Sequence, residues 1–132
     1  MNSESFTTAE LSDSWIEDDE SARWRSATGE VGDDSGSSLL EVPPGCRLPR
    51  HTDSAEETIV VVDGKASVTV GDEQGEVAAG GVALVPECVP HEVRNEGDGP
   101  LRFVALYAGT EVTTTYEQPI QPSGDRESQP LG

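Results

Sequence analysis

Four side chains between residues 51 and 91 have the types and spacing of a metal-binding site. His51 and Asp53 are two residues apart, so in a strand both side chains point to the same face. Glu57 follows the short polar break 54–56 and rejoins that face if the break is a turn or bulge. His91 begins a second strand-like segment further along the chain. The pattern predicts that the four side chains converge from two strands.

Two imidazoles and two carboxylates suit a divalent transition metal such as Fe(II), Mn(II) or Zn(II). No cysteine is needed in this donor set, so a thiolate site for a soft metal is not expected. The two carboxylates would neutralise a divalent ion and favour harder metals over Cu(I). His51 and His91 are the only histidines of the chain. Because the side chain of Asp53 is shorter than that of a histidine, Asp53 is a direct ligand, a hydrogen-bond acceptor beside the metal, or a position where a ligand has been lost.

The residues around this donor set resemble the two motifs of the cupin superfamily. The first motif has a glycine, five residues, His-x-His, three or four residues, a glutamate, six residues and a glycine. The second has a glycine, five residues, Pro-x-Gly, two residues, a histidine, three residues and an asparagine. The matching positions here are Gly45, His51, Glu57, Gly64, Gly80, Pro86, His91 and Asn95, with Asp53 and Cys88 as departures from a histidine and a glycine.

The resemblance implies a small jelly-roll barrel with a metal ion inside it. It implies metal ligation by His51, Asp53, Glu57 and His91, with Fe(II) or Mn(II) favoured and Zn(II) or Ni(II) as alternatives. Three functions stay open: a dioxygenase-like enzyme with Glu57 as catalytic base, a non-redox isomerase, epimerase or lyase, and a binding or sensor module without turnover. A small-molecule ligand and a homodimer are the partners that it implies.

The rest of the chain predicts an all-β fold of short strands joined by Gly and Pro turns. Asp63-Gly64 between two apolar runs predicts a tight hairpin. We expect the barrel over 23–116, an acidic and flexible leader over 1–22, and a disordered tail over 117–132. An alternative for the leader is a short helix that docks on the barrel. The strands are expected at 23–31, 37–42, 58–62, 66–70, 76–79, 82–85, 101–107 and 112–116.

The composition limits which partners and which cellular environment we expect for the protein. The 132 residues suffice for one domain with one core, and the formal net charge is −18, from 26 acidic and 8 basic residues. This charge argues against nucleic acid or an anionic membrane as a partner, and it is typical of proteins adapted to high salt. No signal peptide or membrane-length apolar run is visible, so we expect a cytoplasmic protein. Cys46 and Cys88 are too few for a disulfide framework; reduced thiols and a single bridge both stay open.

Overall fold

The computed structural model describes residues 10–131, and all regular structure in that part of the chain is β-strand, so the predicted all-β fold is confirmed. No helix in the described part is long and apolar enough to cross a membrane. The strands are β1 (Ser12–Ile16), β2 (Asp19–Val31), β3 (Gly36–Val42), β4 (Arg47–Asp53), β5 (Glu57–Asp63), β6 (Lys65–Val70), β7 (Glu73–Ala78), β8 (Val82–Val85), β9 (His91–Asn95), β10 (Leu101–Tyr107), β11 (Thr114–Gln121) and β12 (Asp125–Ser128).

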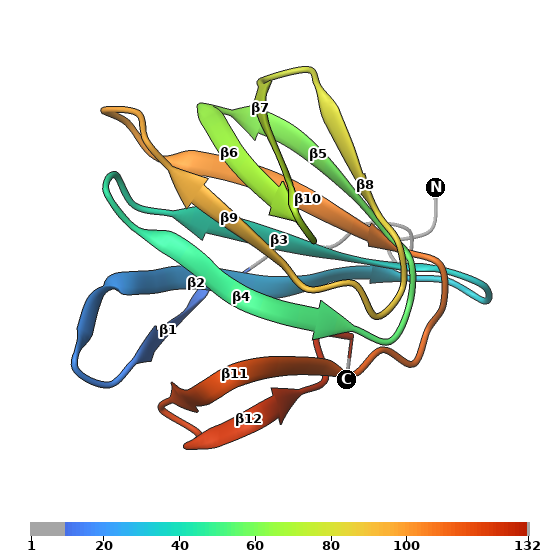
Figure 1. The fold of residues 1–132 in the computed structure, drawn as a ribbon. Coiled ribbons are helices and arrows are strands. Elements are labelled where there is room, and N and C mark those ends of the chain that lie inside the picture. Colours follow the sequence, from blue (N-terminus) through green and yellow to red (C-terminus); the bar gives the residue numbers. More distant parts are fainter. Residues whose placement is uncertain (1–9, 132) are drawn as a thin grey trace.

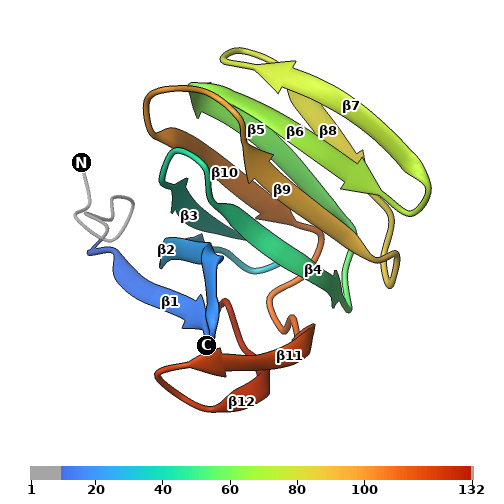
Figure 2. The ribbon, with the colours of Figure 1, turned by 60° about the vertical axis from the view of Figure 1, so that its left-hand side comes forward.

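The strands pair antiparallel along one path that curls into two facing layers. Along it the order is β7-β6-β9-β4-β11-β1-β2-β3-β10-β5-β8, and β12 pairs with β11. One layer contains β2, β3, β10, β5 and β8, and the other contains β7, β6, β9 and β4 (Figure 1). Figure 2 shows the β11–β12 hairpin beside β4 and β1, where it links the two layers. This is a small jelly-roll barrel, as predicted.

The core lies between the two layers because each strand turns alternate apolar residues inward. Ile59 on β5 and Phe103 on β10 contribute from one layer, and Val68 on β6 and Val93 on β9 from the other; all four are fully buried or nearly so. In β9 the burial alternates residue by residue, which places His91, Val93 and Asn95 on the inner face. The side chain of His91 is therefore directed into the barrel.

The turn between β5 and β6 has the geometry that its Asp-Gly sequence predicts. Gly64 has a φ of +86°, in the left-handed region that glycine adopts without strain. A Cβ on Gly64 would lie 2.8 Å from the backbone oxygen of Pro100. The turn therefore requires glycine both for its dihedral angles and for the close approach of the neighbouring loop.

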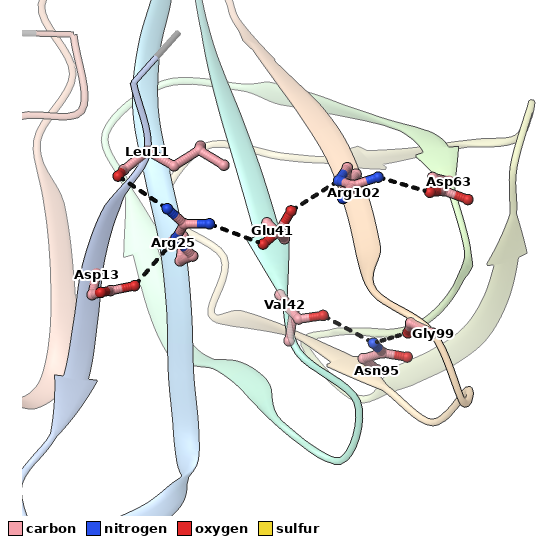
Figure 3. Close-up of polar contacts among 9 residues, drawn as sticks. All are labelled: Leu11, Asp13, Arg25, Glu41, Val42, Asp63, Asn95, Gly99 and Arg102. Carbon is pink, nitrogen blue, oxygen red and sulfur yellow. Dashed lines mark hydrogen bonds and ion pairs between the residues drawn. The ribbon is translucent and has the colours of Figure 1, made fainter.

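A chain of ion pairs runs across five strands on the outer surface (Figure 3). Arg25 on β2 contacts Asp13 on β1 and Glu41 on β3, at 3.2 and 3.4 Å. Arg102 on β10 contacts Glu41 at 2.8 Å and Asp63 at the end of β5 at 3.1 Å. Each Arg thus separates two carboxylates, which limits their repulsion in this acidic chain.

Asn95 ends β9 with three hydrogen bonds to the backbone, two of them drawn in Figure 3. Its side-chain nitrogen donates to the carbonyls of Val42 and Gly99, at 2.9 and 2.8 Å, and its side-chain oxygen accepts from the Gly97 amide at 2.9 Å. The residue is 1% exposed. Its role in this chain is to join the end of β3 to the loop that leads into β10.

Both ends of the described chain differ from the expectation of flexible or disordered segments. Residues 12–22 lie in β1 and the start of β2 rather than in a flexible leader or a docked helix, and residues 1–9 lie outside the described residues. Residues 117–128, expected as disordered tail, complete β11 and form β12. Gly124, with a φ of +80°, closes the turn between them, so this Pro- and Gly-rich composition marks a hairpin.

Candidate metal centre

Three strands, rather than the two predicted, bring the four site residues to one place inside the barrel, because the turn at 54–56 separates Glu57 from His51 and Asp53. His51 and Asp53 share the inner face at the end of β4, and Glu57 begins β5 after the turn 54–56. His91 begins β9 and pairs directly with His51 in the ladder. One ligand atom from each side chain lies within 4.8 Å of all the others, and all four residues are buried. The cluster has the size and the donors of a metal site.

Backbone carbonyls fix the orientation of both histidine rings. Nδ1 of His51 lies 2.7 Å from the carbonyl oxygen of Pro49, and Nδ1 of His91 lies 2.9 Å from that of Val89. A carbonyl accepts only from an N–H, so Nδ1 carries a proton in each ring. Nε2 of both rings then faces the carboxylates. Metal-bound histidines are usually oriented by a backbone contact of this kind.

The carboxylates complete the cluster and leave one buried oxygen without a hydrogen bond. Nε2 of His91 lies 3.1 Å from Oε1 of Glu57 and 3.1 Å from Oδ2 of Asp53, and Nε2 of His51 lies 3.7 Å from the same Oδ2. Thr114 donates to Oδ1 of Asp53, but Oδ2 has no partner with hydrogen-bond geometry. An unsatisfied buried carboxylate oxygen between two imidazoles fits a cation at this point.

Burial and mutual charge set the protonation of the cluster without a metal. Burial, together with the neighbouring His91, lowers the pKa of His51 to about 4. Burial alone would lower the pKa of His91, but the carboxylates of Asp53 and Glu57 outweigh it and raise the pKa to about 10. Burial raises the pKa of Glu57 to about 7. Burial would also raise the pKa of Asp53, but its polar neighbours, His91 first, hold it well below its usual range. A proton on His91 thus partly balances the buried negative charge.

None of the four donors lines the cavity of about 400 Å³ on this side of the barrel, but three of its lining residues are their direct neighbours. Its floor includes Tyr107, Thr114 and Tyr116, which are the cross-strand partners of Glu57, Asp53 and His51 in the ladders. Burial, aided by the charges of the two carboxylates, raises the pKa of both tyrosines far above the usual range, so both phenols stay protonated. The cavity therefore offers hydroxyl groups close to the candidate metal site.

Some features of the site follow from sequence patterns and others do not. Trp24 and Tyr107 line this cavity, whereas Phe103 is packed in the core. Thr114 was not anticipated, because its role depends on the pairing of β11 with β4, and no local pattern predicts that pairing.

The two cysteines are free thiols, Cys46 half-buried and Cys88 exposed. Cys88 stands where the second cupin motif has a glycine, and its φ of +61° explains why glycine is typical there. Its amide donates to the carbonyl of Asp53 at 2.8 Å. The loop before His91 is thus tied to β4 through its backbone.

The fold and the buried donor set define a small jelly-roll barrel with a candidate metal centre. The cupin domain model matches residues 38–107, more than half of the chain. The chain belongs to the cupin family, as the sequence motifs indicated. No curated protein gives a significant match.

Solved structures with this fold include oxalate decarboxylases. An S161A mutant of Bacillus subtilis oxalate decarboxylase is 25% identical, with a TM-score of 0.65, over 77% of this chain and 29% of that one. The formate complex of Lactobacillus farciminis oxalate decarboxylase is 21% identical, with a TM-score of 0.68, over 81% and 33%. A Streptococcus pyogenes protein of unknown function is 19% identical, with a TM-score of 0.58, over 70% and 79%.

The chain thus spans less than a third of the Bacillus subtilis enzyme. Another structure of that enzyme is described by its Mn(II) centres. The likeness supports the fold, and it makes a divalent metal the natural occupant to test at the cluster of this chain.

Proposed function

We propose that the protein is a metal-dependent enzyme that acts on a small organic molecule, with His51, Asp53, Glu57 and His91 as the ligands of one divalent metal ion. Fe(II) or Mn(II) is the favoured metal. The observation that carries the proposal is the buried cluster itself, with four donors within 4.8 Å and an Oδ2 of Asp53 that has no hydrogen bond of good geometry. Such a site is costly to bury without a cation, because two carboxylates share it.

Each of these residues would have its own role in such a site. Both imidazoles would present Nε2 to the ion, since each Nδ1 is held by a backbone carbonyl. Asp53 would be kept in place by the Thr114 hydroxyl. Glu57 is the proposed catalytic base, because its carboxylate lies beside His91 and its ladder partner Tyr107 lines the cavity. A bound metal would supply a Lewis acid or a redox centre.

The first reaction class to test is that of a dioxygenase. Four protein ligands leave up to two positions of an octahedral ion for small molecules. Oxygen consumption with phenolic and enediol compounds, in protein loaded anaerobically with Fe(II) or Mn(II), tests this class. Glu57→Gln should abolish the consumption, while Glu56→Gln, at the exposed neighbouring acid, should leave it unchanged. Consumption that is the same in both variants would refute the role of Glu57.

A non-redox lyase is the second candidate, favoured by the 25% identity to the Bacillus subtilis decarboxylase. Such an enzyme, or an isomerase or epimerase, would convert its substrate under nitrogen as fast as in air, which separates it from a dioxygenase. Saturable ligand binding with no product under either gas would instead identify a binding or sensor module.

A further inference from the structure

The wall of the cavity beside the cluster is polar but almost without charge. Its side chains are dominated by hydroxyl groups, among them those of Ser12, Ser14, Ser26, Thr28, Ser38 and Thr114. Among the described residues, no Lys, Arg or His lines it, and Glu10 is its one carboxylate. In a chain with 26 acidic residues, a wall of neutral hydroxyl groups is unusual, and it bears on which ligands the cavity can bind.

One of these hydroxyls makes no hydrogen bond of good geometry within the protein. Ser38 on β3 is 3% exposed, and its Oγ has no partner with hydrogen-bond geometry, although it lies beside the Tyr107 phenol. A buried hydroxyl without a partner is unfavourable. Because Ser38 lines the cavity, an oxygen of a bound molecule can complete its hydrogen bonding.

The aromatic residues of the wall and the lack of charge on it further limit the class of ligands that the cavity can bind. Trp24 and Tyr116 stack with ring centroids 5.5 Å apart and both line the cavity, so part of its wall is aromatic. Among the described residues no Lys, Arg or His lines the cavity, so an anionic ligand would lose its hydration there without gaining an ion pair with the wall.

We propose that this cavity binds an uncharged small molecule that carries hydroxyl or carbonyl groups, and that it rejects carboxylates and phosphates. The bound molecule is a substrate only if the proposed function holds, and to that extent this inference rests on it. Binding of the molecule itself needs no metal. It separates this chain from the oxalate decarboxylases of the same fold, whose named substrate is a dicarboxylate.

A pair of probes of similar size and different charge tests the proposal. 4-Hydroxybenzyl alcohol is neutral at pH 7, and 4-hydroxybenzoate has the same phenol ring with a carboxylate. Binding is followed by the fluorescence of Trp24 in the Trp15→Phe variant, first in chelator-treated protein and then in metal-loaded protein. We expect the alcohol to bind at least about tenfold more tightly in chelator-treated protein, and a factor of ten corresponds to about 1.4 kcal/mol.

Two neighbouring serines provide matched variants. Ser38→Ala should weaken binding of the alcohol severalfold without lowering stability, because its Oγ makes no hydrogen bond of good geometry. Ser37→Ala should leave binding unchanged but lower stability, because Ser37 Oγ accepts from the Glu30 amide at 2.9 Å and donates to the Glu30 carbonyl at 3.1 Å. Equal binding of the two probes, tighter binding of the benzoate, no saturable binding of the alcohol, or no effect of Ser38→Ala would overturn the proposal.

Metal content measured on the same samples keeps the two proposals apart. Stoichiometric metal without a charge preference would leave the proposed function standing and remove the inference about the ligand. A preference for the neutral probe in a protein that binds no metal would do the opposite.

Discussion

Replacing Asn95 by alanine removes three hydrogen bonds from a fully buried side chain at the end of β9. The carbonyls of Val42 and Gly99 lose their donor, and the Gly97 amide loses its acceptor. At about 1 kcal/mol for each bond, the free energy of unfolding should fall by about 3 kcal/mol. For a domain of this size, that loss lowers Tm by roughly 12 °C, at about 4 °C for each kcal/mol.

Asn95→Asp is the sharper variant because it keeps the shape of the side chain. Its carboxylate still accepts from Gly97, but it places an oxygen where the carbonyls of Val42 and Gly99 need a donor. The loss should therefore exceed that of the alanine variant at pH 7. Urea denaturation of both variants, followed by circular dichroism, measures the two losses. A loss below about 1 kcal/mol for Asn95→Ala, or a smaller loss for Asn95→Asp, would refute the role that we assign to this residue.

Three further predictions concern the turn, the ion pairs and the charge. Gly64→Ala should lower the free energy of unfolding by about 2 kcal/mol or more, because the left-handed φ and the 2.8 Å approach to Pro100 both oppose a Cβ. Gly75→Ala, with open space around it, should raise the free energy of unfolding by about 0.5 kcal/mol in the same urea assay. The hydrogen bond from Arg102 is the main reason why the pKa of Glu41 is lowered. This pair therefore stabilises the fold above the ordinary pKa of glutamate, and the stabilisation is lost as the pH falls through the lowered pKa. Arg102→Gln should flatten the fall in Tm between pH 5 and pH 3, and an unchanged slope would contradict this. The net charge of −18 should make Tm rise with KCl up to molar concentration, where the screening length is ~3 Å, and a Tm independent of KCl would argue against salt adaptation.

Local patterns predict the barrel strands well. The expected strands 82–85 and 101–107 coincide with β8 and β10, and the Asp63-Gly64 turn lies where the dipeptide predicts it. In these segments, alternating apolar residues and turn-forming residues point to the same structure, so no distant contact is needed for the prediction.

The two terminal hairpins are harder to predict because few of their residues face the core. In β1 only Ile16 is fully buried, and β12 has no buried residue. The pairing of β1 with β11 joins residues that are about a hundred positions apart, among them Ile16 and Ile120. Sequence periodicity does not predict contacts between such distant residues. For the same reason, it does not predict that Thr114 binds Asp53.

The candidate site was predictable in its members but not in its surroundings. The spacing of His51, Asp53, Glu57 and His91 is enough to place them on inner faces, since the strand period and one turn decide it. The cavity depends on the curvature of the barrel and on the terminal strands that wall it. Its uncharged lining becomes visible only in the folded chain.

The most direct test of the account is the metal content of the protein purified without chelator, in the wild type and in the His91→Ala and Asp53→Ala variants. We predict about one equivalent of iron or manganese in the wild type, none in His91→Ala, and a reduced amount in Asp53→Ala, with Glu56→Ala as a folded control that retains the metal. A wild type that remains free of metal after anaerobic reconstitution with Fe(II) and Mn(II), or a His91→Ala variant that binds metal as the wild type does, would contradict the proposed centre.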